Sequence, residues 1–87
     1  MERKQFEADL VREGFSVKEA AMEAGPPKAM HTHDFDARVL VLDGEITIDR
    51  EDGATTYRAG DAYSVPAGTP HTETVGPSGV SYLAGRR

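Results

Sequence analysis

The chain has 87 residues, no cysteine and a formal net charge of −5. This length allows one small domain, and the lack of cysteine excludes both a disulfide framework and a thiolate metal ligand. The acidic charge balance and the scattered lysines and arginines argue against nucleic-acid binding. No apolar run approaches the length of a membrane span, and the charged N-terminus does not resemble a secretory signal. We therefore expect a cytoplasmic protein.

Residues 3 to 13 predict a short helix. Phe6 and Leu10 are four residues apart and share a face, while charged residues fill the remainder. Gly14 is a typical helix stop. We therefore expect residues 1–14 to form a helical segment that packs on the rest of the chain or on a dimer partner, with residues 15–87 as a single β-domain.

The remainder of the chain predicts short strands separated by turns. Residues 15–24 show period-two alternation, and two Asp-Gly pairs, at 43–44 and 52–53, predict hairpins. The further expected strands lie at residues 37–42, 45–50, 54–57, 62–65, 71–75 and 80–83. Many short strands at this spacing indicate an all-β barrel or sandwich.

All three histidines belong to two short segments of this β-domain. His31 and His33 stand at i and i+2, which places both side chains on one face of an extended strand. His71 follows a turn rich in Pro and Gly and can arrive beside them on another strand. Neutral imidazoles are good ligands for Zn, Cu, Fe and Ni. From the pair alone, solvated or structurally hydrogen-bonded histidines are the more common explanation of the pattern.

The spacing around the histidines resembles the two motifs of the cupin superfamily. The first reads Gly25, five residues, His31-x-His33, three residues, Ala37, six residues, Gly44. The second reads Gly60, five residues, Pro66-x-Gly68, two residues, His71, three residues, Val75. The resemblance spans roughly residues 24 to 84. It implies a small single-domain cupin with a double-stranded β-helix, or jelly-roll barrel, that pairs as a homodimer.

The resemblance also implies a metal site, with two departures from the family pattern. Ala37 stands where the family usually has a ligating Glu, and Val75 replaces an Asn that commonly closes the second motif. We therefore expect His31, His33 and His71 to bind one divalent ion without that Glu. The sequence does not distinguish Fe, Zn, Ni, Mn and Cu as the metal.

Strand parity predicts which other side chains face the site. If His31 and His33 point inward, so do Phe35, Ala37, Val39 and Val41, whereas Asp36, Leu40 and Leu42 point outward. The outward leucines require cover from the helix, through Phe6 and Leu10, or from a second subunit. This need is the second reason to expect a homodimer.

Glu73 shares the parity of His71 and is the acidic residue best placed to face the cavity. It is a candidate fourth ligand, hydrogen-bond acceptor for a histidine or general base, and the alternative is a solvent-facing Glu. The expected ligand pocket comprises Phe35, Ala37, Tyr63 and Val75. Tyr63 either offers its hydroxyl to a ligand or only packs in the core.

Three neutral ligands leave a divalent ion its full charge, which favours a small anionic or enolisable ligand. Cupins with three histidines and no Glu include dioxygenases, so the resemblance implies a metal-dependent dioxygenase, with isomerase and lyase as other enzyme classes. Two further hypotheses stay open: a cupin that binds or senses a small ligand without turnover, and a barrel with a vestigial site and a structural role.

Overall fold

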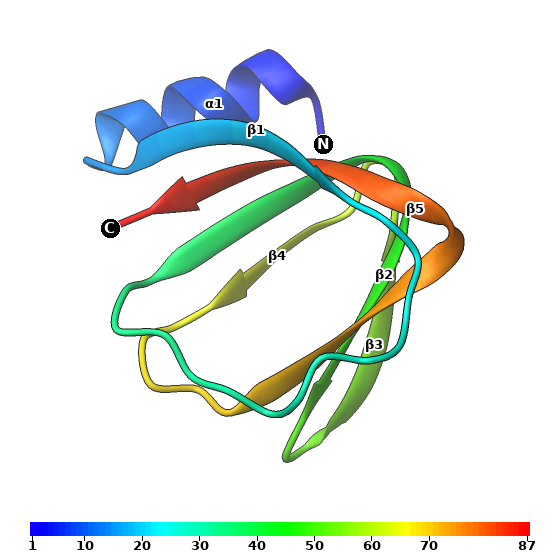
Figure 1. Cartoon of the computed structure of the whole chain (residues 1–87). Helices are drawn as coiled ribbons and strands as arrows, with labels where there is room; N and C mark the ends of the chain where they lie inside the picture. The colour runs from blue at the N-terminus through cyan, green and yellow to red at the C-terminus, as the bar shows by residue number, and fades with distance from the viewer.

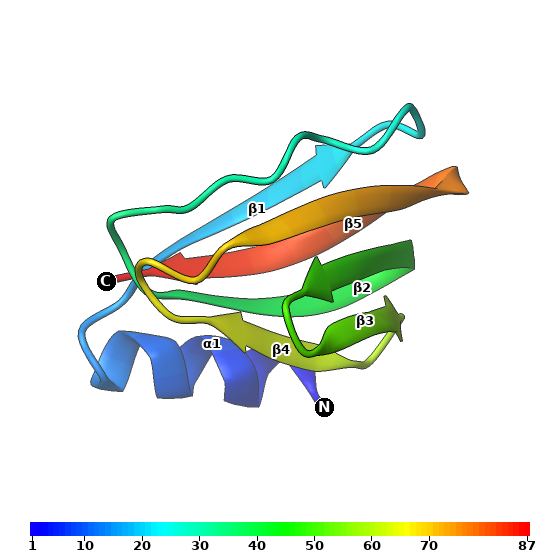
Figure 2. The ribbon, with the colours of Figure 1, turned by 90° about the horizontal axis from the view of Figure 1, so that it is seen from below.

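The computed structural model describes all residues from 1 to 87 and contains one helix and five strands. The helix is α1 (Arg3–Arg12), and the strands are β1 (Ser16–Met22), β2 (Ala37–Arg50), β3 (Gly53–Arg58), β4 (Ala62–Val65) and β5 (His71–Arg86). All pairings are antiparallel within one sheet of order β1-β5-β2-β3, and β4 also pairs with β2. The sheet curls into an open barrel (Figures 1 and 2), which confirms the all-β prediction.

Helix α1 lies on the outer face of this barrel (Figure 1). Its N-cap is Glu2, whose carboxylate accepts hydrogen bonds from the backbone N–H groups of Lys4 and Gln5, and it ends before Gly14, which adopts φ 85°. With ten residues, α1 lacks the length and hydrophobicity of a membrane-crossing helix.

The apolar face of α1 covers the leucine that parity directs outward. Phe6 and Leu10 are 2% and 0% exposed and form one cluster with Leu40, which is 1% exposed. The cluster also includes Phe15 and Leu83, and Val17 and Leu42 pack against it. Burying a side chain of this size contributes roughly 1.5–3 kcal/mol, so α1 and the sheet stabilise each other.

A second apolar cluster fills the inside of the barrel. It consists of Val41, Ile46, Ile48 and Val80, with Met22, Tyr57, Tyr63, Val75 and Tyr82 packed around it. The neighbours Leu40 and Val41 thus point to opposite faces of β2 and are both 1% exposed. The apolar run at residues 39–42 of β2 shows no alternation because this strand is covered on both faces.

The prediction of a hairpin at Asp43-Gly44 is wrong, because β2 continues through these residues. The pairing of β2 with β5 shifts register between Val41 and Asp43 and again between Gly44 and Ile46. Gly44 has φ 78°, and a Cβ atom there would lie 2.0 Å from the carbonyl oxygen of Gly79 on β5. The glycine thus permits a bulge and a close backbone approach, not a chain reversal.

The two strands expected at 71–75 and 80–83 are likewise one bent strand, β5. It opposes β2 on both sides of the same bulge, and Figure 1 shows the bend. The hairpin predicted at Asp52-Gly53 is confirmed, since Arg50 pairs with Gly53 at the start of β3. The strand expected at 62–65 coincides with β4.

Candidate metal centre

Backbone hydrogen bonds hold the two histidine segments together. His31 donates its backbone N–H to the carbonyl of His71 at 3.0 Å, and His71 donates to the carbonyl of His31 at 3.1 Å. The backbone N–H of Gly68 donates to the carbonyl of His33 at 2.9 Å. The Pro- and Gly-rich turn before β5 is therefore attached to the segment that carries the other two histidines.

The three imidazoles converge on one point. Ring centroids are separated by 4.4 Å for His31 and His71, 4.9 Å for His31 and His33, and 5.3 Å for His33 and His71. One ring nitrogen from each lies within 4.8 Å of the others. Ligand nitrogens around a tetrahedral zinc ion lie roughly 3.4 Å apart, so small side-chain rotations fit these rings to one ion.

Two of the histidines are oriented by backbone carbonyls. The Nδ1 atom of His31 lies 2.8 Å from the carbonyl oxygen of Ala29, and Nδ1 of His71 lies 2.9 Å from that of Thr69. A carbonyl only accepts, so each Nδ1 must carry the proton, which leaves the Nε2 lone pair free. Metal-binding histidines commonly have this arrangement, which fixes their tautomer and ring orientation.

The surroundings of His33 favour its neutral form. Partial burial lowers the pKa of His33 below its ordinary value, and the neighbouring His31 and His71 lower it further. The His71 side chain is buried, with the residue only 1% exposed. Neutral imidazole is the form that binds metal, so this environment suits a cation site.

Glu73 faces the histidine cluster. Its Oε1 atom lies 3.7 Å from Nε2 of His31, beyond hydrogen-bond distance, and its side chain is 18% exposed. Glu73 is opposite Ile48 in the pairing of β5 with β2, two residues after His71. A carboxylate this close to His31 is placed to interact with an ion held by the cluster or with a ligand of that ion.

A cavity of about 190 Å³ adjoins this cluster inside the barrel. Its wall includes His33 and Glu73, together with Phe35, Ala37 and Tyr63 from the expected pocket. Val75 instead packs against the interior apolar cluster and lines a neighbouring hollow. Asp36 is engaged elsewhere, because its Oδ1 accepts a hydrogen bond from the backbone of Ala67.

Tyr63 packs in the core and also lines the cavity. Its ring stacks on Tyr57 at a centroid distance of 4.5 Å. Burial and then the nearby Glu73 raise the pKa of Tyr63 far above its ordinary range. The same two causes raise the pKa of Tyr82, on the cavity wall. Both phenols therefore stay protonated and can donate hydrogen bonds.

Three cavity residues with polar side chains were missed from the sequence, namely Lys28, Tyr82 and Arg86. The bend of β5 shifts its pairing with β2, so odd positions face inward before the bend and even positions after it. The alternation of Val80, Tyr82 and Ala84 carries a weak signal of this change. Lys28 lies outside the strands, where parity makes no prediction, although its backbone N–H donates to the carbonyl of Glu73.

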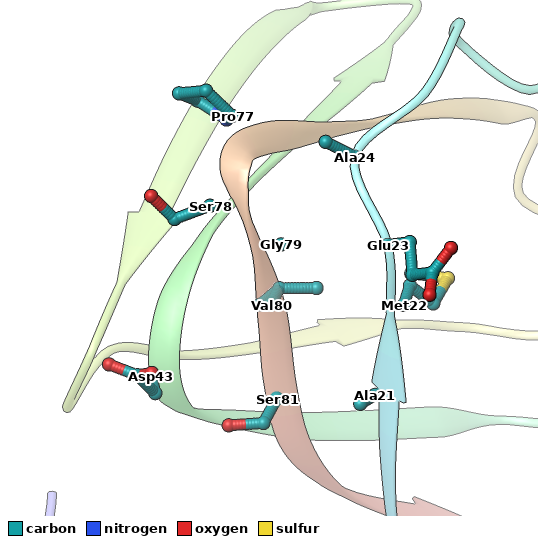
Figure 3. A pocket seen from close by; sticks show the side chains of 10 residues that line it. All are labelled: Ala21, Met22, Glu23, Ala24, Asp43, Pro77, Ser78, Gly79, Val80 and Ser81. Carbon is teal, nitrogen blue, oxygen red and sulfur yellow. The ribbon is translucent and has the colours of Figure 1, made fainter.

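A larger cavity, of about 600 Å³ and shown in Figure 3, has no histidine in its wall. It borders the end of β1 and the bend of β5. Its two carboxylates, Glu23 and Asp43, point away from each other in Figure 3. Because this cavity lacks convergent polar groups, the smaller cavity beside the histidines is the candidate site.

Comparisons with known proteins agree with this architecture. The family model of the cupin domain matches residues 18–78, so the chain belongs to the cupin family. A cupin-2 domain containing protein from Shewanella frigidimarina superposes with a TM-score of 0.68 at 24% identity, over 80% of this chain and 67% of that one. For protein NMB1881 from Neisseria meningitidis the TM-score is 0.70 at 25% identity, over 86% and 75%.

A more distant likeness extends to a structure of DMSP lyases. It has a TM-score of 0.74 at 18% identity and covers 86% of this chain but only 39% of that one. At this identity the likeness concerns the fold alone. A search of curated proteins finds no match to this chain.

Proposed function

We propose that this cupin is a metal-dependent enzyme that acts on a small anionic molecule with an acidic C–H group beside a carbonyl. His31, His33 and His71 are the metal ligands, and Glu73 is the general base. The observation that carries the proposal is the convergence of three imidazoles, two of them oriented by backbone carbonyls, with the carboxylate of Glu73 beside a single cavity.

The donor set suits one divalent ion of Fe, Zn, Ni, Mn or Cu. Held by three neutral imidazoles, such an ion would keep its double positive charge and would supply Lewis-acid chemistry toward an oxygen of the substrate. The usual cupin Glu is replaced by Ala37, which lines the cavity without contributing a charge.

Glu73 supplies the proton chemistry. Its carboxylate takes the proton from the substrate carbon beside the carbonyl and returns it to the same or a neighbouring atom. Tyr63 and Tyr82, both kept protonated, donate hydrogen bonds toward oxygens of the substrate. The cavity of about 190 Å³ is smaller than the roughly 300–1,000 Å³ of typical ligand pockets, which restricts the substrate to a few heavy atoms.

Metal content tests the first part of the proposal. Protein purified without a histidine tag should contain one divalent ion per chain, and the triple variant His31→Ala/His33→Ala/His71→Ala should contain none. Because these are all the histidines of the chain, the variant removes every imidazole. A folded wild-type protein that retains no metal would support the structural barrel instead.

Proton exchange tests the second part. Wild-type protein should speed deuterium incorporation into short 2-oxo acids, followed by NMR, and Glu73→Gln should abolish this while retaining metal. Glu51→Gln, at an exposed hairpin, is the matched control. Dioxygen consumption without exchange would instead indicate the dioxygenase reaction. Metal and ligand binding with neither reaction would indicate a non-catalytic binding protein.

We also propose that the protein forms a homodimer, and the feature that supports this is the edge strand β1, not the outward leucines. Since α1 covers Leu40 within the chain, that leucine no longer requires a partner. Strand β1, however, is an edge of the sheet, and an unpaired edge favours pairing with a second copy. Sedimentation equilibrium that gives the monomer mass of 9.4 kDa would contradict the dimer.

A further inference from the structure

Two cationic side chains border the cavity of the metal centre. Arg86 and Lys28 both line it, and both are exposed, so they lie where the cavity meets solvent. Neither forms an ion pair with a carboxylate, whereas four other arginines do. Their positive charges are therefore available to a ligand that enters.

The guanidinium of Arg86 is held by an aromatic stack. Its Cζ atom lies 4.5 Å from the centroid of the Phe35 ring, and Phe35 stacks on His33 at 4.7 Å with an interplanar angle of 26°. Stacking occupies the flat face of a guanidinium and leaves its N–H edge free. The stack thus connects the N–H donors of Arg86, through the ring of Phe35, to the imidazole of His33.

The adjacent arginine shows that this placement is specific. Arg87 lies over Phe15 at 4.5 Å, on the face covered by α1, and donates a hydrogen bond to the carbonyl of Glu13 at 2.8 Å. Arg86 is opposite Ala37 in the pairing of β5 with β2, and Ala37 also lines the cavity. Only the first of the two consecutive arginines belongs to the site.

We propose that Arg86, assisted by Lys28, binds the carboxylate of a short 2-hydroxy or 2-oxo acid and so determines substrate specificity. The planar fork of Arg86 matches a carboxylate in a two-point contact, while the second oxygen of the acid points toward the histidine cluster. This inference rests on the proposed function, because it defines the substrate class of the same site.

The small cavity and the carboxylate of Glu73 favour this class over other anions. Glu73 repels added negative charge, so a singly charged acid is accommodated better than a phosphate dianion. Inorganic phosphate therefore serves as the competing anion in the test.

The experiment compares lactate with lactamide, which keeps the hydroxyl group but lacks the charge, by calorimetric titration of the zinc-loaded protein. Wild type should prefer lactate over both lactamide and phosphate. Arg86→Met should weaken lactate binding by about tenfold, the low end expected for a lost contact to a charged group, and leave lactamide binding within about twofold. Lys28→Met should have a smaller effect in the same direction.

Matched controls are Arg87→Met and Lys18→Met, which remove the same charges outside the cavity, with folding checked by circular dichroism. Equal lactate affinity in Arg86→Met and wild type, or tighter binding of phosphate or lactamide by wild type, would overturn the proposal.

Zinc content, measured on every sample, separates this test from the proposed function. If wild type holds no zinc, the proposed function fails, and the lactate titration is followed by NMR on the apoprotein. Lactate-induced changes in amide chemical shifts near Phe35 that are present in wild type and absent in Arg86→Met would still support the carboxylate site. The absence of such changes in wild type would contradict it.

Discussion

Replacing Ala37 by Glu tests the geometry of the whole site. Ala37 begins β2, lies opposite Val65 and Arg86 on its two neighbouring strands, and lines the cavity with His33. A carboxylate introduced there would become a fourth metal ligand and would lower the net charge of the centre from two to one. We expect zinc affinity to rise by about tenfold or more, or roughly 1.4 kcal/mol, and azide affinity to fall.

Two free-energy terms act against the Ala37→Glu substitution, namely overpacking of the core and pairing of the new carboxylate with Arg86. Overpacking a core typically costs about 1–3 kcal/mol, and the cavity of about 190 Å³ beside Ala37 places this substitution at the low end. A cross-strand pair with Arg86 would contribute about 0.2–1 kcal/mol and would hold the new carboxylate away from the metal. Because the pairing with Arg86 is weaker than the expected gain in zinc binding, zinc affinity should still rise, and adding Arg86→Met should increase it further.

Zinc affinity is measured by competition with a chromophoric chelator, and azide affinity from the visible spectrum of the cobalt-substituted protein. Ala62→Glu is the control, because Ala62 is opposite Leu40 and exposed on the outer face. A folded Ala37→Glu variant with unchanged zinc and azide affinities would show that position 37 does not face the metal, and the parity argument for the site would fail.

Three further outcomes follow from the fold and the histidine cluster. In urea denaturation, Gly44→Ala should destabilise the protein by about 3 kcal/mol, since its Cβ would lie 2.0 Å from a carbonyl oxygen of β5, whereas Gly25→Ala, with open space around it, should be close to neutral. By the same measurement Phe6→Ala should cost about 3–5 kcal/mol and Val11→Ala, 63% exposed, less than about 0.5 kcal/mol. The metal-free protein should lose stability as the pH falls below about 6.5. The pKa of His33 is lowered in the folded protein, so the unfolded chain takes up the proton at a higher pH than the folded chain. His33→Gln should reduce the dependence of the unfolding free energy on pH, and an unchanged dependence would contradict this explanation.

Much of the fold was predictable because local patterns and long-range packing agree. The spacing of Phe6 and Leu10 predicted the helix and its buried face, and the odd-even alternation predicted that Leu40 points away from the histidines. The family resemblance contributed what periodicity cannot, namely that His71 arrives beside His31 on a paired strand.

Most of the errors have one physical source, the bend of β2 and β5. A glycine with positive φ serves a hairpin and a bulge equally well, and only the partner strand decides between them. Gly44 pairs with Val80, and the carbonyl oxygen of the preceding Gly79 occupies the space that a side chain would need. Because the bulge shifts the register, it also concealed the inward positions of Tyr82 and Arg86.

The same bend connects the stability of the barrel to the composition of its site. Between Leu83 and Arg86, alternate residues of β5 serve two faces: Leu83 packs under α1, while Ala84 and Arg86 line the cavity. A shift of one residue in this strand would move Arg86 to the helix side and Leu83 into the cavity. The burial of Leu83 under α1 therefore fixes the register that places Arg86 on the cavity wall. If Arg86 binds the carboxylate as proposed, the helix contributes to ligand specificity without touching the ligand.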